Sequence, residues 1–264
     1  MEEPDTQALT ATGARLLALA DAFQRDGFVV VPGFCPAALC DSLQQEIEVS
    51  LQPLLGPAEF EADVGYPGAP HDRESEGGDT PRRLLHAYSR FAALRPWITG
   101  PAVRQLLRAL LNCDAVSLSQ CHHNCIMTKY PGYSSVTLWH QDVRYWSFRR
   151  PELVSLWLAL GEERTDNGAL QVIPGSHRQR YAAEQMDDAQ FLRADLPENR
   201  ALLDRAVTVE LNRGDVLLFH CRTFHAAEKN HTDSVKLSGV FTFHDERNQP
   251  VRGTKSAQYP SIPL

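Results

Sequence analysis

The sequence predicts a mainly β protein, either a sandwich or a barrel, with α-helices packed around the outside of its β core. After about residue 115, short apolar segments rich in β-branched and aromatic residues alternate with turn residues, as in all-β proteins. Before that point, apolar residues recur at helical spacing. Because the chain shows no repeat and no low-complexity tract, we expect one domain over residues 1–264. It comprises a helical part over about 1–113, a β core over about 114–245 and a short C-terminal tail.

The first part of the chain is expected to contain three helices and one short strand. Helical spacing of apolar residues covers 14–25, 37–54 and 101–112. The segment FVVVPGF, over 28–34, predicts a strand that ends at Pro-Gly. The stretch 55–82 is rich in Gly, Pro and acidic residues, so we expect a long exposed loop. A loop of this length in a compact domain is usually a lid, a binding loop or disordered.

The second part of the chain is expected to form eight strands. Each is a short apolar segment bounded by turn residues. The strands are 115–119, 124–130, 136–142, 153–160, 168–173, 206–211, 215–220 and 235–244. The segment 178–205 interrupts them and is predicted to be helical or irregular.

Composition and charge exclude several classes of function. The net charge of −7 and the pI near 5.8 argue against a nucleic acid or an anionic membrane as the main partner. No apolar run approaches the roughly 20 residues of a membrane span. The N-terminal MEEPDTQALT lacks the basic start and apolar stretch of a signal peptide. We therefore expect a cytoplasmic protein that acts on a small molecule, and the sequence does not predict its oligomeric state.

The six cysteines are expected to be reduced thiols, because they are scattered through a long chain without an export signal. One cluster, formed by Cys121, His122, His123 and Cys125, has the residue types of a zinc site. A structural zinc site needs four ligands, usually with a second paired spacing that is missing here. We interpret these residues as alternating positions of a strand.

A candidate metal site lies at the end of the predicted strand VTLWHQD. On a strand, His140 and Asp142 project from the same face and can bind one metal ion together. A third ligand must come from elsewhere, and His220 and His225 are both available. Two histidines and one carboxylate leave open positions on the metal, as iron(II) oxygenases require. The H-x-D tripeptide alone is a weak signal, since a strand end facing solvent often carries the same residues.

Four sequence blocks follow one another in a specific order: FQRDGFVVVPGF, TKYPGYSSVTLWHQDVRYWSF, LWLALGEERTDNGALQVIPGSH and GDVLLFHCRTFHAAEKN. Through them, roughly over 22–245, the chain resembles the phytanoyl-CoA dioxygenase family of iron(II)/2-oxoglutarate oxygenases. The resemblance implies a double-stranded β-helix core (jelly-roll, cupin-like) with the metal at one mouth of the barrel. It implies iron(II) bound by His140, Asp142 and His225, with 2-oxoglutarate and O2 as co-substrates. His220 stands where the family has a non-ligating histidine.

The distal carboxylate of 2-oxoglutarate needs a cationic partner, because a buried carboxylate without one is costly. The family usually supplies an arginine eleven residues after the distal histidine, and here that position is Lys236. This is a departure, because lysine cannot bind a carboxylate bidentately. Lysine can still act as a point charge, helped by the hydroxyl of Ser238 or Thr137. Lys129 and Arg222 are the alternative cations.

The resemblance implies further contacts. Trp157 stands where the family places an aromatic residue against the co-substrate, although a core tryptophan fits the same apolar strand. Cys125 stands where an apolar side chain contacts the co-substrate. Arg144, Tyr145 and Trp146 follow the H-x-D motif and are expected to line the pocket entrance as substrate contacts, with surface packing as the alternative.

The predicted reaction is hydroxylation of an unactivated C–H bond in a small-molecule metabolite, with release of succinate and CO2. Asp142 favours hydroxylation, or desaturation, cyclisation or epimerisation from the same radical, over halogenation, because related halogenases have a small residue in place of the carboxylate. Two alternatives stay open. The same His/Asp/His site could hold zinc for hydrolysis. The chain could also be a catalytically silent β-helix binding or sensor module, for which the lysine at position 236 leaves room.

Overall fold

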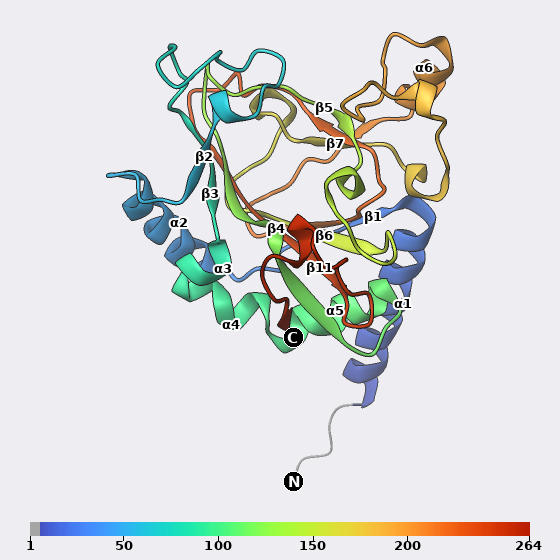
Figure 1. Ribbon diagram of the computed structural model, residues 1–264. Coiled ribbons are helices and arrows are strands. Elements are labelled where there is room, and N and C mark those ends of the chain that lie inside the picture. The colour runs from blue at the N-terminus through green and yellow to red at the C-terminus, as the bar shows by residue number, and fades with distance from the viewer. Residues whose placement is uncertain (1–5) are drawn as a thin grey trace.

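The computed structural model describes residues 6–264, and two antiparallel β-sheets face each other within it (Figure 1). The strands of the larger sheet are β1 (Phe28–Val31), β2 (Ala58–Phe60), β3 (Pro81–Leu85), β4 (Val116–Lys129), β6 (Leu153–Ala159), β9 (Val216–His220), β11 (Lys236–Asp245) and β12 (Ile262–Pro263). Seven of them run in the order β1-β9-β6-β11-β4-β3-β2, and β12 pairs with β4. Most neighbours in this order are distant in sequence, so loops must cross between the two sheets.

The smaller sheet completes the jelly-roll that the sequence predicted. Its strands are β5 (Thr137–His140), β7 (Leu170–Val172), β8 (Val207–Thr208) and β10 (His225–Ala227). They lie in the order β5-β10-β7-β8, and every pair is antiparallel. The strand β10, which was not expected from the sequence, lies at the centre of this small sheet between β5 and β7.

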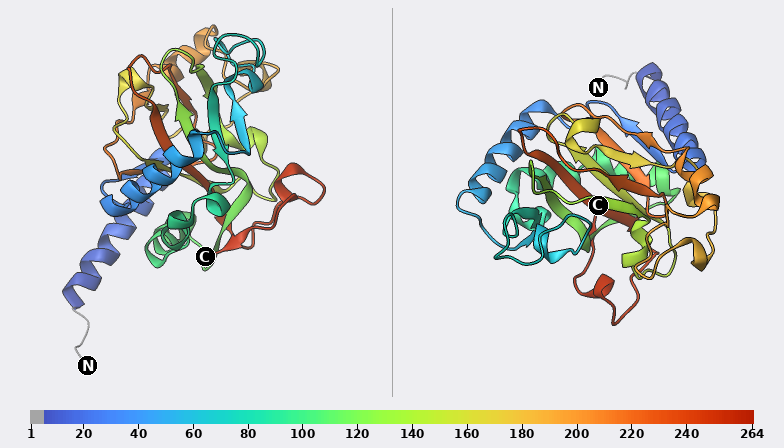
Figure 2. Two further views of the ribbon diagram at one scale, coloured as in Figure 1. Left: turned by 90° about the vertical axis from the view of Figure 1, so that its left-hand side faces the viewer. Right: turned by 90° about the horizontal axis from the view of Figure 1, so that it is seen from above.

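The helices lie on one side of the sheets (Figures 1 and 2). They are α1 (Thr6–Asp26), α2 (Ala37–Leu51), α3 (Ala87–Arg90), α4 (Arg95–Ile98), α5 (Pro101–Leu111) and, apart from the others, α6 (Pro197–Leu203). The predicted helices 14–25, 37–54 and 101–112 correspond to α1, α2 and α5. None of the described helices is long and apolar enough to cross a membrane.

Two apolar cores share the central strands of the larger sheet. In β6, Leu156 and Leu158 pack toward the helices, where Phe23 of α1 and Leu106 of α5 also lie. The residue between them, Trp157, faces the smaller sheet instead. Because alternate residues of a strand point to opposite faces, β6 and β9 are mostly apolar on both faces, with Ser155 and His220 as the exceptions, and both strands are buried at every position.

Two predicted strands, 115–119 and 124–130, form the single long strand β4. Its pairing with β11 is interrupted: Phe241 lies opposite Asn124, but the next residue, Thr242, lies opposite Ser119. Residues 120–123 therefore have no partner on β11 and form a wide bulge. A bulge breaks the alternation of side chains and can aim a residue in a new direction, often beside an active site.

The prediction of a long exposed loop over 55–82 was only partly correct. The stretch contains β2 and the start of β3, and it brings charged residues into the interior. Glu61 and Arg82 are 1% and 3% exposed, and their side chains form an ion pair at 3.1 Å. A sequence of charged residues indicates a solvated segment, but opposite charges can be buried when they pair with each other. The predicted strand 206–211 was also too long, since only β8 forms.

Candidate active site

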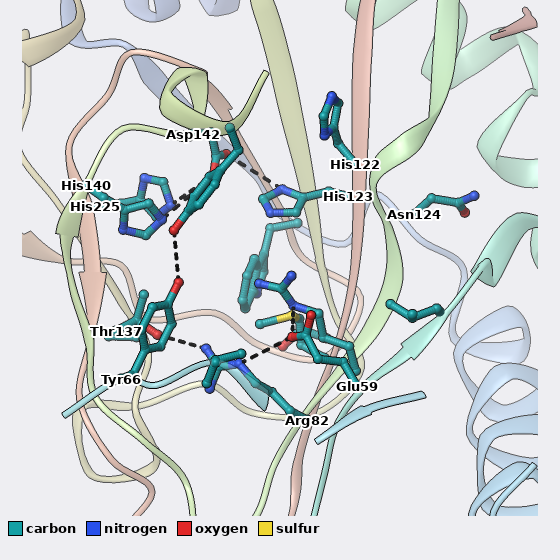
Figure 3. Close-up of a pocket in the computed structure, with 18 of the residues that line it drawn as sticks. Glu59, Tyr66, Arg82, His122, His123, Asn124, Thr137, His140, Asp142 and His225 are labelled. Carbon is teal, nitrogen blue, oxygen red and sulfur yellow. Dashed lines mark hydrogen bonds and ion pairs between the residues drawn. The ribbon is translucent and has the colours of Figure 1, made fainter. Parts of the chain in front are cut away.

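Three side chains converge where β5, β10 and a short turn meet. His140 is the last residue of β5, and His225 is the first residue of β10. These strands are antiparallel neighbours, and their register places the two histidines opposite each other with ring centroids 4.2 Å apart. Asp142 begins the 3-10 turn η3 (Asp142–Tyr145), so it is not part of the strand as the sequence analysis supposed. The turn nevertheless brings its carboxylate to the same point (Figure 3).

The geometry of these three residues fits a divalent metal ion. Oδ1 of Asp142 lies 3.9 Å from Nε2 of His140 and 3.6 Å from Nε2 of His225. The Nδ1 atom of His140 donates to the carbonyl of Leu138, and that of His225 to the carbonyl of Thr223, at 2.8 and 3.1 Å. When neutral, each Nε2 therefore presents a lone pair, and Oδ1 of Asp142 is buried with no hydrogen-bond partner in the described part of the chain. Three acceptors that face one another need a cation between them.

Burial of the three side chains favours the neutral imidazole of His140, the form that can bind a metal ion. Both imidazoles and the carboxylate are at most 5% exposed. Burial, and then the neighbouring His225, lower the pKa of His140 to about 3, so this imidazole is neutral at physiological pH. A neutral imidazole is the form that binds a metal.

Two further side chains surround the carboxylate of Asp142. Ser155 on β6 donates to its Oδ2 at 2.8 Å. The Nδ1 atom of His123 lies 3.7 Å from the same oxygen (Figure 3), and this nitrogen is buried with no hydrogen-bond partner among residues 6–264. His123 belongs to the bulge of β4, which explains why its direction could not be derived from strand alternation. The zinc cluster considered for residues 121–125 is not formed in residues 6–264, and His122 bonds to Ser256 instead.

A cavity of about 680 Å³ opens beside the three residues, between the two sheets. Most residues predicted to contact co-substrate or substrate line it, as do several that were not predicted. The predicted ones are Lys129, Lys236, Ser238, Thr137, Trp157, Arg144, Tyr145 and Trp146. This size is typical of pockets for small organic ligands.

Two predicted contacts are not supported by the structure. Cys125 does not line the cavity; it is 1% exposed and packs in the apolar core beside Trp157. Arg222 also lies outside the cavity, and its guanidinium donates to the carbonyl of Gln179. His220 is not part of the metal group, as predicted, and its Nε2 bonds to Glu152 at 3.0 Å.

Comparison with known proteins decides the family. A sequence profile of the phytanoyl-CoA dioxygenase family (PhyH) matches residues 23–238. The chain belongs to this family. The resemblance stated from the motifs is thereby confirmed, and the predicted iron(II), 2-oxoglutarate and O2 are the cofactor and co-substrates that the family uses.

Individual relatives are distant. Dioxygenase lolE1 of Epichloe uncinata is 30% identical over 159 residues, which cover 60% of this chain. Phytanoyl-CoA dioxygenase domain-containing protein 1 of Mus musculus is 25% identical over 84% of this chain and 87% of its own length. For lolE1 and two other curated relatives, the match spans only 57%, 36% and 56% of the relative's own length.

A solved structure confirms the fold. The epimerase SnoN, in complex with Fe3+, α-ketoglutarate and nogalamycin RO, is 21% identical to this chain, and the comparison covers 96% of both chains with a TM-score of 0.70. At this level of identity the likeness shows the jelly-roll fold and no more.

The family's usual arginine position, occupied here by Lys236, is part of a buried network around Glu163. The ammonium group of Lys236 lies 2.9 Å from Oε2 of Glu163. The other carboxylate oxygen accepts hydrogen bonds from Ser238 at 2.6 Å and from the indole of Trp157 at 2.8 Å. Glu163 is fully buried. Its role was not predicted from the sequence, because nothing in the segment GEER marks this residue as internal.

Lys129 lies next to Lys236 on the neighbouring strand and is largely buried. Its ammonium group approaches the carbonyl of Ser135 at 3.3 Å, and it forms no ion pair within residues 6–264. Burial, and then the positive charges of Lys236 and Arg82, lower the pKa of Lys129 to about 7. A negatively charged ligand at this end of the cavity would stabilise the charged form of Lys129.

The stretch 55–82 also contributes to the cavity, as expected of a binding loop. The hydroxyl of Tyr66 lies 3.1 Å from that of Tyr145, beside the metal group (Figure 3). Arg82 donates to the hydroxyl of Thr137 at 3.3 Å and to that of Ser135 at 2.7 Å. The hydroxyl of Thr137, suggested from the sequence as a helper for 2-oxoglutarate, is therefore already a partner of Arg82.

Replacing Ser155 with alanine is expected to weaken iron(II) binding by about tenfold or more, because residues that hold a ligating carboxylate contribute to metal affinity. Affinity is measured by anaerobic titration with iron(II). Ser117→Ala, a change of a buried serine outside the cavity, is the matched control. Equal affinity in the two variants would show that Ser155 does not support the carboxylate.

Replacing Glu163 with alanine is expected to lower the free energy of unfolding by about 3–5 kcal/mol, because it leaves the buried ammonium group of Lys236 without a partner. Urea denaturation measures the change. The adjacent Glu162→Ala is the control, since Glu162 is exposed and pairs with Arg164 at the surface. Its expected loss is about 1 kcal/mol or less. Equal losses in the two variants would contradict the assigned role of Glu163.

Proposed function

We propose that this chain is an iron(II)- and 2-oxoglutarate-dependent dioxygenase that hydroxylates an unactivated C–H bond of a small molecule. In the overall reaction, R–H, 2-oxoglutarate and O2 give R–OH, succinate and CO2. The observation that carries the proposal is the convergence of His140, Asp142 and His225, in which the buried Oδ1 of Asp142 has no hydrogen-bond partner within residues 6–264. Two imidazoles and one carboxylate are the ligand set of non-haem iron(II) oxygenases.

Each part of the site has a task in this reaction. Bound iron(II), together with 2-oxoglutarate and O2, supplies the oxidising power for C–H cleavage. The backbone carbonyls of Leu138 and Thr223 orient the two imidazoles. Ser155 holds the second oxygen of Asp142. The burial of all three ligands excludes bulk water, which protects the reaction from side products.

The distal carboxylate of 2-oxoglutarate is proposed to bind at the Lys236 end of the cavity. Glu163 already compensates the charge of Lys236 and holds its ammonium group in place. The charge of Lys129 has no such compensation within residues 6–264. The two lysines together therefore supply the cation that the family's arginine provides alone, and Lys129 supplies the net charge.

The open coordination and the carboxylate of Asp142 favour hydroxylation over the alternatives. A zinc hydrolase would use the same three ligands. The two lysines at the proposed 2-oxoglutarate end of the cavity, Lys129 and Lys236, would then have no role. A silent binding module would need neither the metal nor the orienting contacts. Formation of succinate from 2-oxoglutarate separates the three functions, because only the oxygenase forms it.

The variants His140→Ala and Asp142→Ala are expected to lose iron(II) binding and to reduce succinate formation below detection, because each removes one of three ligands. Succinate is measured with iron(II), ascorbate and 2-oxoglutarate. His220→Gln is the control and should keep both properties, since His220 bonds to Glu152 outside the metal group. Full succinate formation by either ligand variant would show that the assigned metal site is wrong.

The affinity for 2-oxoglutarate is expected to fall as pH rises through about 7, because the charged form of Lys129 attracts the carboxylate and its pKa in the free protein is about 7. Binding raises this pKa, so the decrease extends above pH 7. Lys129→Met should weaken binding about tenfold and remove the pH dependence. Lys129→Arg should keep the affinity at all these pH values. Calorimetric titration of the anaerobic iron(II) protein between pH 6 and 9 measures these effects, and a wild-type affinity that does not change with pH would exclude the role of Lys129.

A further inference from the structure

Arg144 is held in one orientation beside the metal group. It follows the ligand Asp142 by two residues in the turn η3. Its guanidinium carbon lies 3.8 Å from the centre of the Phe191 ring and 4.5 Å from that of Tyr145. Both rings also adjoin the ligand His140, with centroid distances of 5.9 and 6.1 Å. Stacking on aromatic faces restricts a guanidinium while leaving its N–H groups free to donate.

The guanidinium of Arg144 has a buried donor that no residue within 6–264 satisfies. Its Nη1 atom is buried and has no hydrogen-bond partner, and Arg144 forms no ion pair within residues 6–264. An unpaired buried donor with a full charge is costly, so such a group is usually kept for a ligand. Arg144 lines the cavity, and its planar fork of donors matches the oxygens of a carboxylate or a phosphate.

The charges of the cavity contrast with those of the whole protein. The chain has a net charge of −7, yet six lysine and arginine side chains line the cavity against three acidic ones. Three of the six are close to carboxylates: Arg82 to Glu61, Arg83 to Glu59, and Lys236 to Glu163.

The other three cavity cations, Lys129, Arg144 and Lys255, have no ion pair in the described part of the chain. Lys129 lies beside Lys236, at the end assigned above to 2-oxoglutarate. Arg144 lies instead in the turn η3, where its neighbour Tyr145 adjoins His140 of the metal group. Lys255 is exposed on the turn η7 (Lys255–Ala257), next to the bulge of β4. Two positive charges therefore remain for a second ligand.

We propose that the substrate to be hydroxylated is a small organic anion, whose carboxylate or phosphate group binds to Arg144. Lys255 attracts the anion at the cavity mouth, and the bound anion presents a neighbouring carbon to the metal group. This inference rests on the proposed function and names the substrate class of the same site. 2-Oxoglutarate, a five-carbon diacid, leaves room for such a molecule in a cavity of about 680 Å³.

The test uses the anaerobic iron(II) protein saturated with 2-oxoglutarate and three probes of similar shape: cyclohexanecarboxylate, cyclohexyl phosphate and the uncharged cyclohexanecarboxamide. Calorimetric titration measures their affinities. At least one anion should bind about tenfold more tightly than the amide, because a charge-assisted hydrogen bond replaces a neutral one. The stronger of the two anions identifies carboxylate or phosphate as the group recognised. The proposal is overturned if the amide binds as tightly as the better anion, or if neither anion binds measurably at millimolar concentration.

Variants assign the effect to Arg144. Arg144→Gln should weaken anion binding about tenfold and leave the amide unchanged, while Arg144→Lys should restore part of the loss. Arg149→Gln removes the charge of a nearby exposed arginine outside the cavity and should change nothing. Unchanged anion affinity in folded Arg144→Gln contradicts the assignment. The preceding 2-oxoglutarate titration tests the proposed function separately: failure there rejects the oxygenase, whereas normal 2-oxoglutarate binding without anion selectivity rejects only this inference.

Discussion

The pairing of β5 with β10 is the constraint on which the site depends. Its antiparallel register places His140 directly across from His225, and the turn after β5 brings Asp142 to the same point. These residues are 85 positions apart in the chain, and only the small sheet joins them. A shift of this register by one residue would turn one imidazole to the other face. The apolar core between the two sheets, with Trp157 and Phe219, holds that register in place.

The positively charged side chains around the cavity are of two kinds: some are paired with a buried carboxylate, and others are not. Glu163 and Glu61 are fully or almost fully buried, and each is paired with a cation on a neighbouring strand or loop. Buried pairs of this kind position side chains more than they stabilise the fold. The cations that lack a carboxylate are the ones available to ligands. An acidic protein can thus present a positive interior to an anionic co-substrate, while its surface stays negatively charged.

The replacement of the family's arginine by Lys236 has a structural context that explains how it is tolerated. An arginine would reach a carboxylate with two parallel donors, whereas a lysine offers a single compact charge. Here the lysine is fixed by Glu163, and Trp157 donates to the same carboxylate. A second lysine, Lys129, lies beside it. Lys236 and Lys129 together keep this end of the cavity positively charged, and the N–H donors come from two side chains instead of one arginine.

The sequence by itself determined the features that depend on local order. The four ordered blocks and the apolar strands identified the family and the jelly-roll, and the H-x-D motif predicted the candidate metal ligands that the structure brings together, because spacing along one strand and motif order are visible in the chain. The tertiary structure alone decided the direction of His123, the burial of Glu61 and Glu163 and, among residues 6–264, the lack of an ion pair at Arg144. These depend on a bulge in β4 and on charge pairs between segments far apart in sequence, and no periodicity along the chain records such contacts. Cys125 depends on the assembled sheets in the same way: it packs with Trp157 between the two sheets, and whether a side chain on that face reaches the cavity is set by its neighbours in space.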